Sequence, residues 1–247
     1  KRGAVLFVPS FAEEMNKSRR QLALQARSLA AAGYAVLLVD LFGTGDSEGN
    51  FGDARWETWL GDLAAAVQWL ATRGHARIVV CALRFGALLA RELVGQVGER
   101  VERLVLWQPV TSGRQYMEQF LRLRVAAAMV GGAPAVTVRD LRDTLARGAA
   151  VEVAGYELHP ELVGAVDRSE LTSYPPSSRV PIHWLELASE PGRGIGAGSQ
   201  RVLAAWRERG ATVAVDEVIG PQFWSTVEIA VAPALIETTT RCVAGPT

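Results

Sequence analysis

Short apolar runs that alternate with amphipathic stretches constrain the fold of this chain more than any other feature. Four runs have the length and the apolar character of strands buried on both faces: residues 3–8, 34–39, 77–82 and 103–107. Three stretches with a helical spacing of apolar residues lie between them: residues 18–32, 56–72 and 86–97. Such alternation implies right-handed crossovers, and hence a mostly parallel, doubly wound α/β sheet with helices on both faces.

This alternation breaks after Pro109. Residues 114–147 are predicted to form two helices. The following stretch, to about residue 178, is predicted to be irregular and to end in Pro175-Pro176. The alternation then returns as a strand, a helix, a strand and a final helix: residues 181–187, 199–209, 211–218 and 227–243.

A single domain with one insertion accounts for all of these elements. A chain of 247 residues, of which 49% are apolar, can build one large core. We therefore predict an α/β core formed by residues 1–108 and 179–247, interrupted by a mostly helical insertion at residues 109–178.

The composition excludes several kinds of partner. The 26 basic residues equal the 26 acidic ones, so no net charge attracts nucleic acid or an anionic membrane. No apolar stretch is long enough to span a bilayer. Cys81 and Cys242 are too far apart in the sequence for a disulfide framework or a metal-ligand motif, which fits a reducing compartment. We expect a cytoplasmic protein without a metal or another cofactor.

A tight turn between a strand and a helix carries the first functional signal. Residues 82–86, Ala-Leu-Arg-Phe-Gly, have the arrangement of the nucleophile elbow of α/β-hydrolases. The loop Asp40-x-x-Gly-x-Gly-x-Ser47 is also widespread in that fold. Nearly the whole chain resembles the family called exosortase A system-associated hydrolase 2. Three segments carry this resemblance: Pro-Ser-Phe-Ala-Glu-Glu-Met-Asn-Lys-Ser-Arg-Arg at 9–20, Leu-Arg-Phe-Gly-Ala at 83–87, and Phe-Trp-Ser-Thr-Val-Glu-Ile-Ala-Val-Ala-Pro at 223–233.

The resemblance has implications for both fold and function. It implies an α/β-hydrolase fold in which the insertion at residues 109–178 forms a lid over a pocket at the carboxyl ends of the strands. Members of the family are encoded with bacterial exopolysaccharide and exosortase machinery. The expected ligand is accordingly a small anionic, acyl or glycan molecule, and the expected protein partners belong to exopolysaccharide assembly.

Hydrolysis by this fold needs a nucleophile, a histidine base and an acid that orients the base. The nucleophile position at the tip of the elbow holds Arg84, whose guanidinium has no lone pair with which to attack a carbonyl. The acid position, after the strand at 181–187, is best matched by Glu190. The base position, after the last strand, holds Gln222, which takes up no proton at neutral pH. Two of the three roles are therefore vacant, and the nucleophile and the base act only together.

Other residues could fill the vacant roles, although each has a simpler structural interpretation. Ser10 beside the oxyanion loop is the best substitute nucleophile, with no evident base, and His159 could reach the pocket from the lid. We interpret the remaining candidates as packing or turn residues: His75, His183, Cys81, Cys242 and Ser47.

Arg84 suits binding better than hydrolysis. In a working enzyme the backbone N–H groups of Phe85 and of the loop near Phe11 form the oxyanion hole. With Arg84 between them, the site is rich in donors and suited to a carboxylate or phosphate. A buried guanidinium needs a partner, and we favour an internal ion pair with Glu13 or Glu14, which a ligand could displace.

Three interpretations remain open at this stage. The leading one is a non-catalytic or divergent member of the family that binds its ligand at Phe11, Glu13, Glu14, Arg84, Phe85 and Gln222. The second is an active ester or thioester hydrolase, or an acyltransferase, in which Ser10 or His159 acts with Glu13, Glu14 or Glu190. The third is a purely structural partner in a membrane-associated assembly.

Overall fold

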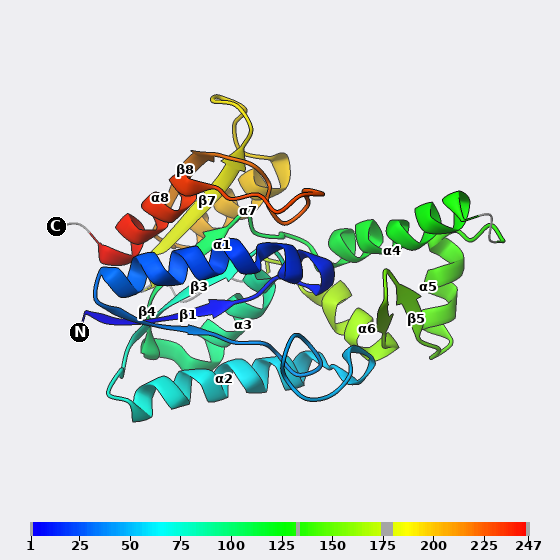
Figure 1. Ribbon diagram of the computed structural model, residues 1–247, viewed down its shortest axis with the longest axis horizontal. Coiled ribbons are helices and arrows are strands. Elements are labelled where there is room, and N and C mark those ends of the chain that lie inside the picture. The colour runs from blue at the N-terminus through cyan, green and yellow to red at the C-terminus, as the bar shows by residue number, and fades with distance from the viewer. Residues whose placement is uncertain (1, 132–133, 174–179, 246–247) are drawn as a thin grey trace. The chain divides into compact units, whose positions relative to one another are not determined.

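Six parallel strands form the central sheet of this computed structural model, which describes residues 2–131, 134–173 and 180–245 (Figure 1). In sheet order they are β2 (Tyr34–Leu38), β1 (Gly3–Val8), β3 (Ile78–Leu83), β4 (Val101–Trp107), β7 (Ile182–Ala188) and β8 (Val213–Ile219). Every neighbouring pair is parallel. The carboxyl ends of all six strands therefore meet at one edge of the sheet.

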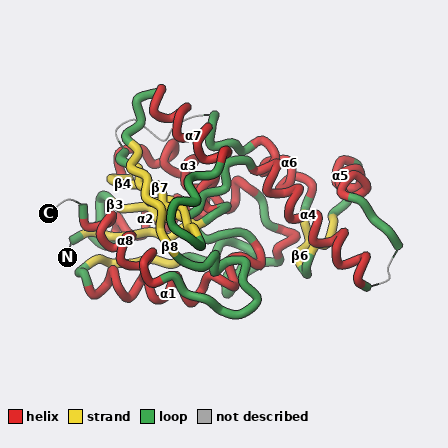
Figure 2. The backbone as a smooth tube through the Cα atoms, turned by 90° about the horizontal axis from the view of Figure 1, so that it is seen from above, coloured by secondary structure: helices red, strands yellow, loops and turns green. Residues whose placement is uncertain are grey.

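Helices cover both faces of this sheet (Figure 2). On one face lie α1 (Ala12–Ala31) and α8 (Pro233–Ala244), and on the other α3 (Gly86–Val97) and α7 (Ala197–Glu208). Side chains that alternate along each strand reach the two layers in turn. Leu185 of β7 belongs to the core under α1 and α8, whereas the ring of its neighbour Trp184 packs 5.7 Å from that of Trp206 on α7. The predicted doubly wound α/β sheet is confirmed.

Most predicted elements lie within two residues of the observed ones, but two helices begin elsewhere. The first helix begins at Ala12, six residues before the predicted start. Ala12 and Met15 are buried there, but polar residues surround them, so the apolar spacing is too sparse to predict a helix. Glu13 and Glu14 in that turn suit the positive end of a helix. The last helix begins at Pro233 and not at residue 227, with the proline in the first turn, where its missing N–H costs no helical bond.

The chain divides into two compact units, and the boundary between them passes through α2 (Trp56–Thr72). The sheet unit contains the six strands and consists of Lys1–Val39, Leu63–Thr111 and Leu171–Thr247. The helical unit consists of Asp40–Asp62 and Ser112–Glu170. No helix in the described part of the chain has both the length and the apolar character needed to cross a membrane.

The helical unit corrects one prediction for the region after residue 147. The two predicted helices are present as α4 (Gly113–Val130) and α5 (Val138–Ala146). The stretch predicted to be irregular contains an antiparallel hairpin, β5 (Val151–Val153) and β6 (Tyr156–Leu158), and the helix α6 (Pro160–Arg168). The turn of the hairpin has positive φ at both central residues, Ala154 and Gly155, which is the backbone of a tight hairpin turn.

Two further predictions about this region are not tested by the structure. The predicted Pro175-Pro176 end of the irregular stretch lies outside the described residues. The division into a core and an insertion at residues 109–178, and the role of that insertion as a lid, stay predictions.

Candidate functional site

Arg84 occupies a sharp turn between β3 and α3, at the carboxyl edge of the sheet. Its φ of 52° lies in the left-handed region that side chains other than glycine rarely adopt. Backbone bonds hold this conformation: the Arg84 N–H donates to Trp107 O at 2.9 Å, and Arg84 O accepts from Ala87 N and Val110 N, both at 3.1 Å. The nucleophile-elbow geometry predicted for this turn is therefore present, with an arginine at its tip.

The Arg84 side chain is mostly buried, and Glu14 is its counterion. Nη2 and Nε of Arg84 lie 3.1 and 3.4 Å from Glu14 Oε1, and each of the two side chains is 19% exposed. Arg84 Nη1 also donates to Gln108 O at 3.4 Å, and Cζ lies 5.1 Å from the ring centre of Trp224. Of the two glutamates considered as partners, the structure thus selects Glu14.

Glu14 also connects the arginine to a buried serine. Ser10 is 6% exposed, and its Oγ donates to the second carboxylate oxygen of Glu14 at 2.5 Å. Ser10 lies in the loop after β1, and Glu14 in the first turn of α1. One carboxylate therefore ties the loop after β1 to the elbow and is shared between a hydroxyl and a guanidinium.

Behind the arginine, a second buried carboxylate holds Gln108. Glu186 on β7 is 5% exposed and accepts from Gln108 Nε2 at 2.7 Å and from Trp184 Nε1 at 3.0 Å. Gln108 Oε1 in turn accepts from Leu187 N at 2.7 Å. Gln108 has a φ of 42°, and this conformation presents its carbonyl to Arg84. Sequence reasoning missed these residues because their contacts join segments about 80 positions apart.

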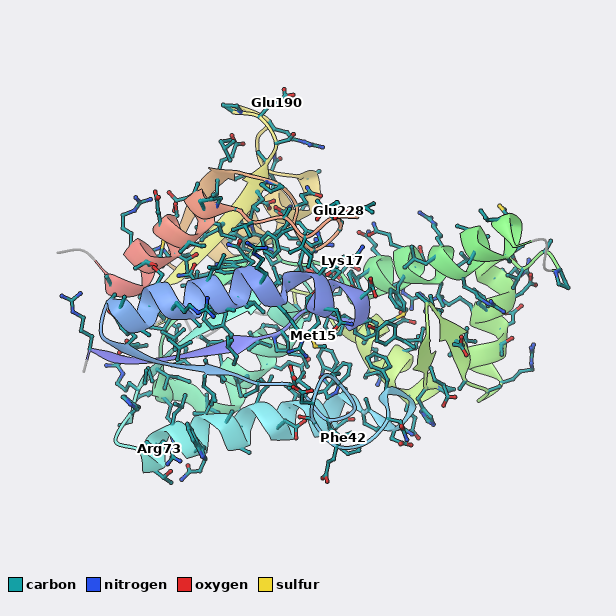
Figure 3. All side chains as sticks on the ribbon, in the orientation of Figure 1. Met15, Lys17, Phe42, Arg73, Glu190 and Glu228 are labelled. Carbon is teal, nitrogen blue, oxygen red and sulfur yellow. The ribbon has the colours of Figure 1, made fainter. Side chains whose placement is uncertain are left out.

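Three of the predicted site residues do not reach the Arg84 cluster, which we define as Ser10, Glu14, Arg84, Gln108 and Trp224. Glu190 is exposed, and Figure 3 shows it at the tip of a loop, pointing outward. Gln222 is exposed as well, and its carbonyl accepts from Ser225. Glu13 is half exposed and pairs with Lys17 at 3.9 Å, one turn further along α1.

The loop after β8 places Trp224, and not Gln222, beside Arg84. This loop buries Phe223 and Trp224 because both are large and apolar, so the chain turns Trp224 and not Gln222 towards Arg84. Trp224 packs against Phe223 with ring centres 5.1 Å apart. An indole offers a polarisable face for the guanidinium but no site that accepts a proton at neutral pH.

Phe11 and Phe85 pack on each other, with ring centres 4.8 Å apart. Both side chains are almost fully buried, so these residues can contact a ligand only through their backbone. The role expected for their backbone N–H groups stays a prediction.

The other candidate nucleophiles and bases are buried, cap a helix or lie away from the elbow. Burial raises the pKa of the Cys81 thiol far above its usual range, so this thiol stays protonated in the core of the sheet. His159 Nδ1 accepts from Glu161 N and caps α6. The two histidines of the sheet unit are far from the elbow in the topology: His75 precedes β3, and His183 is the second residue of β7, both towards the amino edge.

His183 leads to a prediction about pH. Burial first, and then the Arg103 guanidinium, lower the pKa of His183 below its ordinary value of 6.5, against a smaller opposing effect of Asp216. The unfolded chain therefore binds more protons than the folded protein below that ordinary value, so the free energy of unfolding is expected to fall as the pH drops. Urea denaturation at about pH 7.5 and about pH 5.5 measures this fall, which should be smaller in His183→Gln. An equal fall in both proteins would contradict the assignment.

Comparisons with known proteins identify a sequence family and solved structures of similar fold. The sequence family described as serine aminopeptidase, S33 matches residues 1–177. Ferulic acid-bound Est1E from Butyrivibrio proteoclasticus superimposes with a TM-score of 0.69 and 13% identity, covering 98% of this chain and 86% of that one. A putative hydrolase from Agrobacterium vitis S4 superimposes with a TM-score of 0.63 and 14% identity, covering 98% of this chain and 88% of that one. Mouse alpha/beta hydrolase domain-containing protein 10 superimposes with a TM-score of 0.57 and 13% identity, covering 97% of this chain and 87% of that one. No curated protein matches the sequence.

Proposed function

Because the chain belongs to the serine aminopeptidase S33 family of α/β-hydrolases, we propose that it is a member that binds a ligand at Arg84 without serine-triad hydrolysis. A single observation carries this proposal: the elbow keeps its left-handed backbone, but its tip holds a guanidinium paired with Glu14. A permanently protonated group cannot attack a carbonyl. Nor can the indole of Trp224, which packs over it, accept the proton of a nucleophile.

The ligand that suits this site carries a carboxylate or a phosphate. Arg84 presents a planar fork of donors that matches either anion, and it lies directly before the amino-terminal end of α3, where backbone N–H groups favour negative charge. The anion would take the place of the Glu14 carboxylate beside the guanidinium. Est1E, of similar fold, was solved with ferulic acid, so the fold accommodates an organic acid.

The resemblance to the exosortase-associated hydrolases extends the proposal to a biological setting. Its support is the sequence of the segments around the site, 9–20, 83–87 and 223–233, which include Glu14, Arg84 and Trp224. In that setting the ligand is an acidic acyl or glycan intermediate of exopolysaccharide assembly, and the protein acts as an accessory to the assembly proteins in the cytoplasm.

One observation favours hydrolysis as a second candidate function. Ser10 Oγ donates to Glu14 Oε2 at 2.5 Å, so a hydroxyl and a carboxylate are already in contact in a buried position. In this alternative Glu14 would take the Ser10 proton while Ser10 attacks an ester. The pairing of Glu14 with Arg84 opposes it, because a Glu14 carboxyl that had taken the Ser10 proton would leave the guanidinium without its counterion.

The test compares turnover with anion binding. We expect the wild-type chain to hydrolyse no p-nitrophenyl ester and to escape labelling by a fluorophosphonate. Arg84→Ser should stay inactive too, because the new hydroxyl has no histidine base. Calorimetric titration with inorganic phosphate and with ferulate should show binding to the wild type that Arg84→Met weakens by about tenfold or more, the loss of one charge-assisted bond.

Two outcomes would overturn this proposal. Ester turnover or fluorophosphonate labelling that Ser10→Ala abolishes would establish the second candidate in its place. Equal affinity of the wild type and Arg84→Met for both anions would show that Arg84 does not bind them.

A further inference from the structure

Three potential metal ligands converge in the sheet unit, away from the Arg84 cluster. A ring nitrogen of His183, a carboxylate oxygen of Asp216 and Sγ of Cys242 all lie within 4.8 Å of one another. His183 lies towards the amino edge of the sheet, whereas Arg84 follows the carboxyl end of β3. The three potential ligands and the Arg84 cluster therefore lie towards opposite edges of the sheet and have no residue in common.

The strand register explains why His183 and Asp216 meet. His183 pairs with Ala214, and Leu185 pairs with Asp216, on the neighbouring parallel strands β7 and β8. Residues two apart on a strand, and their partners across the ladder, point to the same face. His183 and Asp216 consequently share the face that α8 covers, the face of Leu185 in the core.

The third ligand comes from the last turns of α8, whose position Arg103 fixes. Arg103 Nη1 donates to the carbonyls of Cys242 and Val243, the latter at 2.9 Å. These carbonyls belong to the end of the helix that lacks intrahelical donors, and a guanidinium there also suits the negative end of the dipole. Cys242 is 7% exposed and thus held under the helix, next to the two strands.

From this arrangement we infer that His183, Asp216 and Cys242 form a binding site for Zn²⁺. Imidazole nitrogen, thiolate sulfur and carboxylate oxygen are the ligands that zinc takes in proteins, and three of them leave a fourth tetrahedral position for water. Ligand atoms around tetrahedral zinc are about 3.5 Å apart. Atoms already within 4.8 Å of one another need only side-chain rotation to reach that spacing. Neighbouring residues of the sequence did not reveal this set, because its members are 33 and 26 positions apart.

Zinc binding at this site requires the thiolate form of Cys242. Binding breaks the S–H bond of Cys242, forms a zinc–sulfur bond and releases the thiol proton to solvent, so the affinity is expected to rise with pH. One thiolate and one carboxylate then neutralise Zn²⁺. Burial is the largest effect on the Cys242 thiol and raises its pKa, and Asp216 raises it further, whereas Arg241 and Arg103 oppose the rise. Zinc must therefore displace a firmly held thiol proton.

The exposure of the three ligands suits an accessible site. Asp216 is exposed on the edge strand β8, His183 is half-buried, and Cys242 is buried. The metal would enter from the side of Asp216, where the fourth ligand, a water molecule, would also lie. Three protein ligands and an open fourth position are the arrangement of catalytic zinc centres.

The test uses the full chain after treatment with a chelator. We expect one zinc per chain by elemental analysis and titration calorimetry. The cobalt-substituted protein should show the near-ultraviolet absorption of a cobalt–thiolate bond. Cys242→Ser should abolish that absorption and weaken zinc binding by about 100-fold or more, since loss of even an outer-sphere partner weakens a site 10–100-fold. His183→Gln and Asp216→Asn should weaken zinc binding by about tenfold or more.

Matched variants separate this inference from the others. Cys81→Ala removes the other thiol and should keep the cobalt–thiolate absorption, and Arg84→Met should bind zinc like the wild type. The inference is overturned if the folded wild type takes up no stoichiometric zinc. It is also overturned if Cys242→Ser, His183→Gln and Asp216→Asn bind zinc as tightly as the wild type does.

Discussion

Replacement of Glu14 by glutamine is expected to lower the free energy of unfolding by about 2–3 kcal/mol, because it leaves the Arg84 guanidinium without a counterion in a site that is only 19% exposed. The same change weakens the acceptor of the Ser10 hydroxyl. For a chain of this length, the loss corresponds to a drop in melting temperature of roughly 4–12 °C. Thermal and urea denaturation at neutral pH measure it.

Glu13→Gln is the matched control on the preceding residue. Glu13 is half exposed and pairs with Lys17 at 3.9 Å, so its loss should change stability by less than about 0.5 kcal/mol. If the proposed function holds, inorganic phosphate should raise the melting temperature of Glu14→Gln more than that of the wild type, because no carboxylate competes for Arg84. Equal stabilities of the two variants would show that Glu14 does not neutralise Arg84.

Gly86→Ala is the second substitution with a large expected effect. A Cβ at Gly86 would lie 2.5 Å from Pro9 O and 2.6 Å from Val8 O, both backbone atoms that no side-chain rotation can move. The start of α3 would have to move away from β1, at a cost of about 3 kcal/mol. The expected drop in melting temperature is roughly 6–12 °C. Any anion binding at the elbow should weaken as well, because Arg84 and the loop after β1 would separate.

Gly95→Ala on the same helix is the control for this prediction. A Cβ at Gly95 meets nothing within 4 Å, and alanine favours a helix by about 0.8–1.0 kcal/mol over glycine. This variant should therefore be as stable as the wild type or more so. If Gly86→Ala had the same melting temperature as the wild type, α3 and β1 would not pack as closely as the structure shows.

The sheet could be predicted from sequence because its strands β1, β3 and β7 are buried along nearly their whole length. A continuous apolar run such as Ile78–Leu83 can be recognised as a strand from its own residues alone. The hairpin of β5 and β6 escaped because three-residue strands are too short for alternation to stand out from loops. The start of α1 was missed because only Ala12 and Met15 are apolar there, and the ion pair of Glu14 with Arg84 is a tertiary contact that no local pattern shows.

The site was only partly predictable, for a different reason. The elbow and its arginine follow from local turn chemistry, and the pairing with a glutamate follows from the cost of an unpaired buried charge. Trp224 and Gln108 reach Arg84 through packing that no local pattern specifies. In the loop after β8, burial of apolar surface turns Trp224 inward and leaves Gln222 exposed.

The backbone of Arg84 determines how quickly its partners could exchange. Three backbone hydrogen bonds and a left-handed φ fix the direction in which the side chain leaves the main chain. The freedom that remains lies in the torsions of the side chain itself. An arginine that changes partner by torsion alone needs none of the microsecond-to-millisecond rearrangements that hinged segments require. Capture and release of an anion at this turn would then be limited by diffusion and by the strength of the pair with Glu14, not by movement of the scaffold.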